Sequence, residues 1–330
     1  MRDFDVLFND LSKLKVAVVG DVMLDTYLWG NVERISPEAP VPVVALKNKD
    51  FRIGGAGNVA LNTVALNAST TLFSVIGDDV EGKQLKQLLQ EGNINTSYLI
   101  NSDNRVTTSK TRIMSRNQQM MRLDSETTTD ITEAEEDELI QNFSAYIETE
   151  KPSVVILEDY NKGVLSEKVI SRILEICRSK NIITTVDPKR KNFFSYKGAT
   201  IFKPNLKEIK DALNKIPIDV NQQSLEGIHN ELKANLQHEI SLITLSEHGI
   251  FFNDSSHSEI IPTHVRNIAD VSGAGDTVIA VASLFYAATN DIHLASSVAN
   301  IAGGLVCEEV GTASINKEIL LAECKKLIQH

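Results

Sequence analysis

The segment DVSGAGDTVIAVASLFYAA, residues 270–288, combines small residues, one carboxylate and a long uncharged run. Gly273, Ala274 and Gly275 allow backbone N–H groups to turn toward one point without obstruction by side chains. A helix that begins there adds unpaired N–H groups and the positive end of its dipole, so the turn can bind an oxyanion. Asp276, in the first turn of that helix, could take a proton from an attacking hydroxyl while the anion hole holds a transferring phosphate. The segment therefore indicates phosphoryl transfer.

Several motifs of other nucleotide-binding and metal-dependent enzymes are missing from the sequence. The sequence has no GxxxxGK[ST] loop, no GxGxxG after its first predicted strand and no HExxH metal motif. A nicotinamide-dependent dehydrogenase on a doubly wound sheet needs the dinucleotide fingerprint, which is missing. Taken alone, the glycine turn has a plainer interpretation, in which Asp276 only satisfies the helix dipole at a gain of ~0.3–1 kcal/mol. That gain needs no flanking glycines, which favours the catalytic interpretation.

Composition and charge are those of a folded, soluble protein. Of 330 residues, 42% are hydrophobic and 23% are charged, and the formal net charge is -11. Nucleic-acid-binding proteins usually show a basic face, so nucleic acid is not expected as a partner. No apolar run has membrane-spanning length, and the acidic N-terminus does not resemble a secretion signal. The three cysteines form no CxxC pair, which fits reduced thiols, and we expect a cytoplasmic protein without a membrane partner.

Strand and helix patterns alternate through most of the chain. KVAVVGD, SVVILED, IITTVDP, ATIFKPN and EISLITL are short apolar runs of the kind that form buried strands. Amphipathic segments such as NVALNTVALN and EKVISRILEIC separate them. After EISLITLSEHG the chain is expected to be mainly helical. The pattern predicts an α/β fold in which a doubly wound, mostly parallel sheet carries helices on both faces, in a single domain spanning residues 1–330.

Two segments interrupt this alternation. Residues 26–47 contain three prolines and no helical period, and residues 105–124 alternate and are rich in Thr, Arg and Met. Both are predicted to be exposed strands inserted into the α/β body, where they form a small sheet that acts as a lid, a dimer surface or both. A long surface hairpin without function is the alternative.

GGAGN at residues 54–58 and DVSGAGDT at residues 270–277 resemble, in this order, the two signatures of the ribokinase-like (PfkB) carbohydrate kinases. The resemblance covers the whole chain. It implies a ribokinase-like fold, with Mg-ATP as the phosphate donor. It also implies that Asp276 is the base and that residues 273–276 form the anion hole.

PNLKE resembles the NxxE motif of the same family, in which the acidic group acts through water on the Mg²⁺ that bridges the ATP phosphates. The resemblance therefore places Asn205, Leu206, Lys207 and Glu208 at the nucleotide, and Glu208 at the metal. A helix cap at Asn205 with a glutamate in the first turn is the alternative.

VVGDVMLDTYLWGNVERISPEAPVPVV, SRNQQMMRLD, DYNKGVL, VDPK and VGTASI resemble the D-glycero-D-manno-heptose-7-phosphate kinases of this family. In many bacteria that kinase is the N-terminal half of a bifunctional heptose kinase and adenylyltransferase. A nucleotidyltransferase HxGH signature is missing here, so a stand-alone kinase is expected. The implied reaction transfers phosphate from ATP to the anomeric hydroxyl of heptose 7-phosphate. Its product, heptose 1,7-bisphosphate, leads to activated heptose for surface polysaccharide.

A phosphorylated sugar needs acceptors for its hydroxyls and cations for its phosphate. Asp21 and Asp25 follow the first predicted strand, where the family's sugar-binding carboxylate falls. Gly54, Gly55 and Asn58 would allow close backbone approach and an amide contact, or they form only a tight turn and a helix cap.

The predicted lid carries cations that suit a phosphate monoester. By strand parity one face would hold Lys110, Arg112, Arg116 and Arg122. Further candidates are Lys162 and Lys189. Not all of these can reach one phosphate, so some are expected to serve the lid or a partner subunit. A solvated basic strand is the alternative for any single one.

The TLSEHG segment resembles the family's strand and loop at the ATP phosphates and ribose, which implicates Ser246 and Gly249. Asn300 and Gly303 would flank the adenine, unless they only pack the last helices. Glu158, directly before DYNKG, departs from the small residue expected in close relatives. It could alter the sugar contacts or pair with a lysine.

Three interpretations remain open. They are a heptose-7-phosphate kinase, another sugar kinase of the family, and a catalytically silent sugar-binding protein. The presence of Asp276, Asn205 and Glu208 together argues against the silent protein, because function is carried by the site and not by the fold. The family resemblance also implies a homodimer formed through the lid.

Overall fold

A large sheet with the buried strand β1 in its interior organises the molecule. The computed structural model describes residues 3–116, 118–215, 218–264 and 266–328, and within them this sheet has nine strands in the order β13-β12-β11-β10-β9-β8-β1-β4-β5. The seven strands β11-β10-β9-β8-β1-β4-β5 pair in parallel, whereas β12 and β13 are antiparallel additions. The strands are β1 (Lys15–Gly20), β4 (Ser69–Gly77), β5 (Asn95–Ser102), β8 (Val154–Glu158), β9 (Ile183–Asp187), β10 (Ile201–Phe202), β11 (Ile240–Thr244), β12 (Ile250–Asn253) and β13 (Ser258–Ile261).

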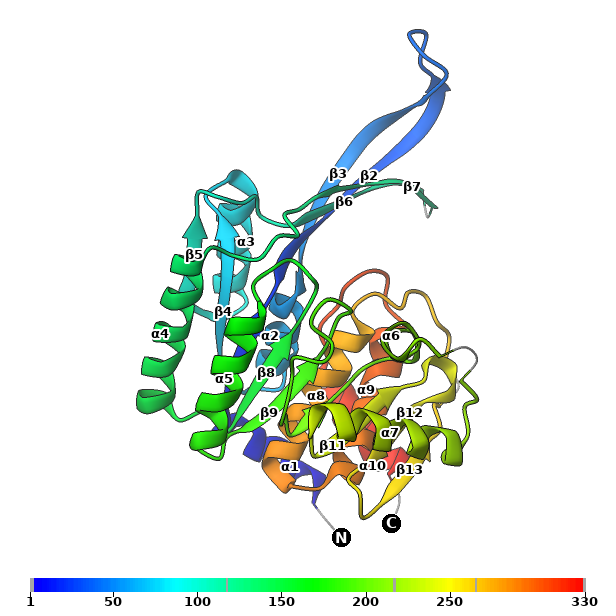
Figure 1. Cartoon of the computed structure of the whole chain (residues 1–330). Coiled ribbons are helices and arrows are strands. Elements are labelled where there is room, and N and C mark those ends of the chain that lie inside the picture. Colours follow the sequence, from blue (N-terminus) through cyan, green and yellow to red (C-terminus); the bar gives the residue numbers. More distant parts are fainter. Residues whose placement is uncertain (1–2, 117, 216–217, 265, 329–330) are drawn as a thin grey trace.

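Helices cover both faces of this sheet (Figure 1). They are α1 (Phe4–Asp10), α2 (Ala56–Ala65), α3 (Val80–Glu91), α4 (Glu133–Glu150), α5 (Glu167–Ser179), α6 (Leu206–Leu213), α7 (Gln222–Leu236), α8 (Ala274–Thr289), α9 (Ile292–Val306) and α10 (Lys317–Leu327), with short 3-10 turns at Leu11–Lys13 and Ser246–His248.

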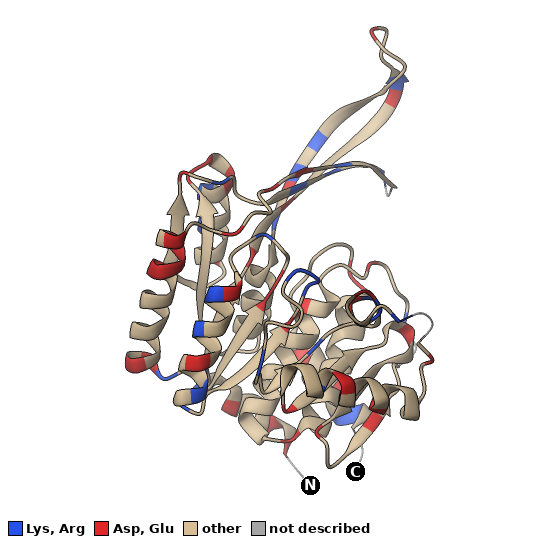
Figure 2. Ribbon diagram, in the orientation of Figure 1, with Lys and Arg blue, Asp and Glu red and all other residues tan. Residues whose placement is uncertain are grey.

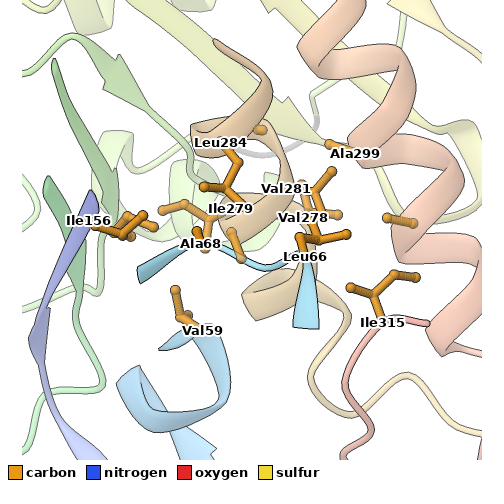
Figure 3. Close-up of a cluster of buried hydrophobic side chains, with 14 of the residues drawn as sticks. Val59, Leu66, Ala68, Ile156, Val278, Ile279, Val281, Leu284, Ala299 and Ile315 are labelled. Atoms are coloured by element: carbon orange, nitrogen blue, oxygen red, sulfur yellow. The ribbon is translucent and has the colours of Figure 1, made fainter. Parts of the chain in front are cut away.

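Two hydrophobic cores lie on opposite faces of the sheet, because side chains alternate along each strand. Val16 and Val18 of β1 belong to the core that includes α2, α8 and α9, whereas Ala17 and Val19 belong to the core that includes α4, α5 and α7. Figure 3 shows part of the first core, which contains Ile156 of β8 among the side chains of α2 and α8. The helices that carry the candidate catalytic residues are therefore fixed against the sheet.

The predicted α/β fold with a mostly parallel sheet is confirmed. The chain after β11 is mainly helical, as expected, although it first adds the short strands β12 and β13. Each has four residues, which is too short for an alternating pattern to be evident. Within the part of the chain that the structure describes, no helix is both long and apolar enough to cross a membrane.

A second, smaller sheet projects from the body (Figure 1). Its described strands are β2 (Val22–Ile35), β3 (Pro42–Gly55), β6 (Ser109–Ser115) and β7 (Gln118–Ser125), in the order β3-β2-β6-β7. The segments predicted as inserted strands lie in this sheet, although the first hairpin continues as far as Gly55. Basic residues lie along its strands (Figure 2). We call this sheet the lid.

Candidate active site

The candidate site lies where parallel strands end and two helices begin. Strands β1, β8, β9 and β10 share one direction, so the residues that follow them meet at one edge of the sheet. Helix α2 starts at the same edge, since the Ala56 N–H donates to the carbonyl of Asp21, 3.0 Å away. Helix α8 starts there too, because Asn58 of α2 bonds to Asp276 of α8.

Asp276 is the best-defined acid of the site. Its side chain is buried, Oδ2 accepts from Asn58 Nδ2 at 2.8 Å, and Oδ1 accepts from the Tyr160 hydroxyl at 2.7 Å. Burial raises the pKa of Asp276 to about 6, although the bonds from Asn58 and Tyr160 lower it. A carboxyl with that pKa is ionised at neutral pH and still basic enough to share a proton with a substrate hydroxyl.

Gly273 and Gly275 shape the turn before this acid. Gly273 caps α8 with φ of 80°, and an added Cβ would lie 2.8 Å from Asn58 Nδ2 and 2.8 Å from Thr312 Cγ2. No other residue type fits there without displacing these neighbours. At Gly275 a Cβ would stand 3.7 Å from both Lys203 Nζ and Asp187 Oδ2, so the backbone of this turn, with Ala274 between the glycines, passes over a buried lysine and the carboxylate that it pairs with. Backbone N–H groups and a cation here suit an anion.

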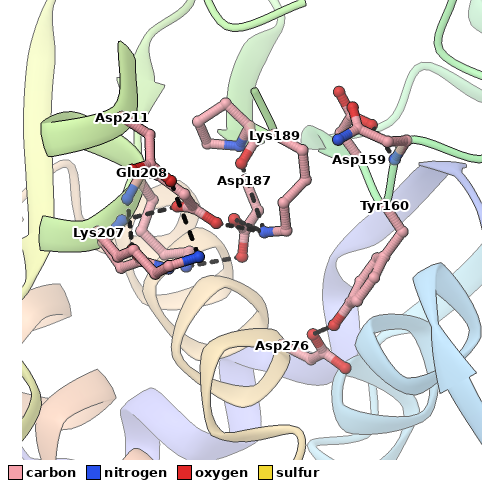
Figure 4. A network of polar contacts seen from close by, with 12 residues as sticks. Asp159, Tyr160, Asp187, Lys189, Lys207, Glu208, Asp211 and Asp276 are labelled. Carbon is pink, nitrogen blue, oxygen red and sulfur yellow. Dashed lines mark hydrogen bonds and ion pairs between the residues drawn. The ribbon is translucent and has the colours of Figure 1, made fainter. Parts of the chain in front are cut away.

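An alternating set of acids and lysines borders this turn (Figure 4). Asp187 accepts Lys203 Nζ at 2.7 Å and Lys189 Nζ at 3.1 Å, and Lys189 also reaches Glu208 at 2.7 Å. Burial opposes the charged form of Lys189, but the carboxylates of Asp187 and Glu208 outweigh it and raise the pKa of Lys189. Both lysines therefore stay cationic, as phosphate binding requires.

Asn205 and Glu208 form a complete capping box at the start of α6. Asn205 Oδ1 accepts from the Glu208 N–H, and Glu208 Oε2 accepts from the Asn205 N–H, each at 2.8 Å. The helix-cap alternative is thus present in the fold, and it leaves Glu208 Oε1 facing Lys189. Leu206 and Lys207 continue the helix, and the Lys207 side chain points to solvent at 87% exposure.

The acids at this edge fit a magnesium ion that is held mainly by phosphates and water. No cluster of three or more His, Cys, Asp or Glu side chains in the described ranges is arranged to bind a metal. Mg²⁺ keeps several waters and needs only one or two carboxylates beside substrate phosphates. Glu208, which contacts Lys189, can supply such a carboxylate.

Glu158 is unusual because it is a buried acid whose carboxyl group has no hydrogen-bond partner among the described residues. It ends β8 and is fully buried. Burial, followed by the neighbouring charges of Asp187 and Asp276, raises the pKa of Glu158 well above its usual range. Its carboxyl therefore contacts no solvent and binds a proton more readily than an exposed glutamate does.

Asp21 anchors the segment after β8. Its Oδ2 accepts the N–H groups of Tyr160 and Lys162 at 2.8 and 2.9 Å, and Oδ1 accepts that of Val164 at 3.0 Å. Its side chain is buried, so in this conformation Asp21 organises a loop. Gly55, at φ of 61°, lies against the Asp21 carbonyl, where an added Cβ would come within 2.3 Å.

Asp25 lies at the base of the lid. It accepts Arg112 Nη1 at 2.5 Å, and Thr312 Oγ1 lies 3.4 Å from its other oxygen. Gly54 leaves room for it, because a Cβ there would stand 2.7 Å from Asp25 Oδ2. The Arg112 guanidinium also lies over the Tyr27 ring, 5.1 Å from its centroid. Asp25, Gly54 and Arg112 thus form one group between the lid and the C-terminal loop.

Of the other predicted cations, two lie near Tyr160 and the loop after β8, and two lie farther out on the lid hairpin. Lys110 Nζ lies 5.4 Å from the centroid of the Tyr160 ring, whose hydroxyl bonds to Asp276, and Lys162 pairs with Glu126 at 2.7 Å. Arg116 is exposed in the turn after β6, and Arg122 on β7 pairs with Asp124. Along an extended strand, Arg116 is roughly 20 Å from Lys110. The structure therefore does not bring Arg116 to Asp276 of its own chain.

The other predicted nucleotide residues lie after β11 and on helix α9. Ser246 follows β11, whose Thr244 bridges Asn205, so it reaches the same sheet edge and is exposed there. Gly249 at φ of 96° lies against the Ile261 carbonyl. Asn300 of α9 donates to the Pro262 carbonyl at 2.8 Å.

Gly303 packs on α8, because an added Cβ would meet Val278 Cγ2 at 2.8 Å. Helix packing therefore accounts for this glycine, which was the alternative to a place beside adenine.

Sequence reasoning did not identify three residues of this site, Tyr160, Asp187 and Lys203. Tyr160 and Asp187 belong to the DYNKG and VDPK segments, of which only the lysines, Lys162 and Lys189, were predicted to bind substrate. Lys203 directly precedes the PNLKE motif. The available signal was position, since each follows or ends a predicted buried strand.

Comparisons with known proteins identify the family and the fold. The model of the "pfkB family carbohydrate kinase" matches residues 13–319. The bifunctional protein HldE of Aliarcobacter butzleri is 43% identical over 306 residues, which cover 92% of this chain and 63% of that protein. The HldE protein of Helicobacter hepaticus is 40% identical and covers 93% and 63%. This chain thus spans less than two thirds of the length of these relatives.

Solved structures show the same fold. Phosphofructokinase-2 from Escherichia coli, in complex with potassium, superposes with a TM-score of 0.78 at 16% identity, covering 94% of this chain and 99% of that one. Ribokinase of Arabidopsis thaliana, complexed with ribose and ATP, gives a TM-score of 0.70 at 15% identity, covering 93% and 98%. The sequence match, extending over most of the chain, shows that this protein belongs to the pfkB family of carbohydrate kinases.

Proposed function

We propose that the protein is an ATP-dependent kinase that phosphorylates the anomeric hydroxyl of D-glycero-D-manno-heptose 7-phosphate. The observation that carries the proposal is the buried Asp276, which two donors hold at the glycine turn of α8 beside Lys189 and Lys203. Family membership supports a sugar kinase, and the resemblance of the lid and loop segments to heptose-7-phosphate kinases supports the sugar.

Asp276 acts as the base in this proposal. It accepts the proton of the anomeric hydroxyl as the sugar oxygen bonds to the γ-phosphorus of ATP and the bond from that phosphorus to the β–γ bridging oxygen breaks. The turn at residues 273–276 and the Lys203 ammonium beneath it stabilise the charge on the transferring phosphate. ADP leaves with the bridging oxygen, and the product is heptose 1,7-bisphosphate.

The remaining candidate residues divide between the two substrates. Lys189, Asn205, Glu208, Ser246 and Gly249 border the ATP side, where bound Mg²⁺ would neutralise phosphate charge and Glu208 would hold it through water. Lys110, Arg112, Asp25 and Asn58 border the sugar side, where Lys110 is the cation that we assign to the 7-phosphate. Asp21 and Lys162 shape this side by ordering the segment after β8.

Two further features belong to this proposal. The lid would pair with a second copy of the chain, because Met121 and Leu123 of β7 expose apolar side chains. The product would supply a cytoplasmic route to nucleotide-activated heptose for surface polysaccharide, in keeping with the heptose-kinase resemblance.

Replacement of Asp276 tests the base directly. Asp276→Asn keeps the size and the Asn58 and Tyr160 neighbours but cannot accept the proton, so turnover should fall by ~10²–10⁴-fold while ATP still binds. Steady-state ADP release and ATP titration by calorimetry measure the two properties. Turnover within a few-fold of the unsubstituted enzyme would rule Asp276 out as the base.

A further inference from the structure

We propose that Tyr160 is a positioning residue that orients the carboxylate of Asp276 and links it to a lysine of the lid. The inference rests on the proposed function only in taking Asp276 as the base. The proposal starts from Tyr160 itself, a residue that sequence reasoning did not single out and that lies between both substrate sides of the site.

The first observation is the hydrogen-bond arrangement around the base. Tyr160 donates to Asp276 Oδ1 at 2.7 Å and Asn58 donates to Oδ2 at 2.8 Å, so each carboxylate oxygen has one donor from a different element. Two such bonds fix the plane of the carboxylate. Each oxygen retains a second lone pair, which leaves a defined direction for the substrate hydroxyl.

The second observation is that the position of Tyr160 is itself fixed. Its N–H, together with that of Lys162, donates to Oδ2 of the buried Asp21, which follows β1. Tyr160 is thus held by the residue that follows β1, an interior strand of the sheet, and its hydroxyl reaches across the site to α8 (Figure 4). Rigid support of this kind is what a positioning group needs.

The third observation is the pair of cations on the tyrosine ring. Lys110 Nζ of the lid lies 5.4 Å from the ring centroid, and Lys189 Nζ of the body lies 5.3 Å from it. Lys189 also contacts Asp187 and Glu208 on the nucleotide side. One ring therefore touches a cation from the sugar side and a cation from the nucleotide side, while its hydroxyl holds the base.

The effect of Tyr160 on the pKa of Asp276 can be separated from the effects of the charged groups nearby. Asp187, which ends β9, and Lys189, two residues on, act with opposite signs on the pKa of Asp276, and the pKa of the buried Glu158 of β8 is raised well above its usual range. Asn58 from α2 and Tyr160 are uncharged donors that favour the ionised carboxylate. Loss of the hydroxyl alone removes one donor and no charge, so it should raise the pKa of Asp276.

The test is a titration of Asp276 without substrate. We would label aspartate with ¹³C at the carboxyl, assign the Asp276 signal with Asp276→Asn, and follow it with pH in the unsubstituted protein and in Tyr160→Phe. The pKa of Asp276 should rise by about one unit in Tyr160→Phe, as expected for the loss of one hydrogen bond to a charged group. An unchanged pKa would overturn the proposal.

Tyr196→Phe is the matched control. Tyr196 is buried and donates to Asp159 Oδ2 at 2.8 Å, so its replacement also removes a tyrosine–aspartate bond, but one that does not involve Asp276. The Asp276 titration should be unchanged in this variant. An equal shift in both variants would attribute the effect to general loosening of the site and overturn the specific role.

Steady-state kinetics provide a second test of the role of Tyr160. With heptose 7-phosphate, the acidic limb of kcat in Tyr160→Phe should move to higher pH by the same amount, and kcat on the plateau should fall roughly tenfold with the KM for ATP unchanged. If Tyr160→Phe changed neither the acidic limb of the pH profile nor the plateau value of kcat, the positioning role would be refuted. If the unsubstituted protein does not turn over this sugar, the proposed function fails, whereas the carboxyl titration still decides the role of Tyr160.

A reciprocal measurement guards against poor folding of Tyr160→Phe. The carboxylate of Asp276 helps to keep the Tyr160 phenol protonated, so in Asp276→Asn one tyrosine should ionise at lower pH than in the unsubstituted protein. Ultraviolet difference titration detects this change. Identical tyrosine titrations in the two proteins would contradict the Tyr160–Asp276 contact.

Discussion

At the scale of single residues, the site depends on carboxyl groups placed where water does not reach them. Asp276 and Glu158 are both buried, yet only Asp276 has hydrogen-bond donors from side chains. Burial raises the pKa of both acids, but the two donors lower that of Asp276, whereas Glu158 has no such donor in the part of the chain that the structure describes and its pKa lies well above the usual range. Two acids at the same edge of the sheet thus differ in pKa because their partners differ.

Burial of the base should make the protein less stable as the pH rises. The pKa of Asp276 in the folded protein, about 6, lies above its ordinary value of 3.8, so the folded state holds a proton that the unfolded chain has already released. This stabilisation is complete below pH 3.8 and is lost as the pH rises through 6. Relative to the unsubstituted protein, Asp276→Asn should gain about 2 kcal/mol in free energy of unfolding between pH 4 and pH 7.5. Urea unfolding at both pH values measures the gain, and an equal difference between the two proteins at both would contradict the buried titration.

At the scale of elements, the lid places cations of different kinds along one strand. Lys110 at the start of β6 lies over Tyr160, and Arg112 two residues on is tied to Asp25. Arg116 lies beyond the end of the strand and is exposed. Cations that look equivalent in the sequence thus have different surroundings in the structure, because Lys110 lies at Tyr160 of the site whereas Arg116 lies beyond the far end of the strand.

Lys110 and Arg116 should therefore differ in their effect on sugar binding. Lys110→Met removes the cation nearest the site and should raise the KM for heptose 7-phosphate by ~10–100-fold, with a smaller effect on the unphosphorylated sugar. Arg116→Ala serves as the control on the same hairpin and should change neither KM by more than about twofold. A larger effect at Arg116 would mean that this arginine serves the site of a partner subunit, and it would remove Lys110 as the main phosphate contact.

The fold and part of the site were predictable because they rest on local patterns. The buried strands follow from apolar runs such as KVAVVG, and the place of Asp276 follows from a glycine turn before an apolar helix. The bond from Tyr160 to Asp276 was not predictable, because it joins residues 116 positions apart and depends on how β8 and α8 pack. That Glu158 has no hydrogen-bond partner among the described residues was likewise not predictable, because it depends on how β1, β8 and β9 lie side by side.

At the scale of the whole molecule, the lid leaves an apolar surface that the single chain does not cover. Met121 and Leu123 of β7 are 55% and 53% exposed, and Leu46 of β3 is 58% exposed. Exposed edge strands with apolar side chains are prone to pair with another chain. The proposed homodimer would cover them.

A charge on β7 should separate such a dimer. Leu123→Lys should convert the protein to a monomer in sedimentation-velocity runs, because a buried lysine without a partner is costly. Ile319→Lys is the control, since Ile319 on α10 is similarly exposed at 52% and lies outside the lid. Sedimentation of Leu123→Lys as the same dimer would exclude β7 from the interface.

The measurement that tests the central claim most directly is ADP release with Mg-ATP across a panel of acceptors, namely heptose 7-phosphate, fructose 6-phosphate, ribose, fructose and adenosine. Asp276→Asn run in parallel reports any contaminating kinase. The account predicts strong turnover on heptose 7-phosphate alone, lost in the variant. Turnover on a different sugar would contradict the assignment of the lid to a heptose phosphate, and binding of sugar without turnover on any acceptor would contradict the assignment of Asp276 as a working base.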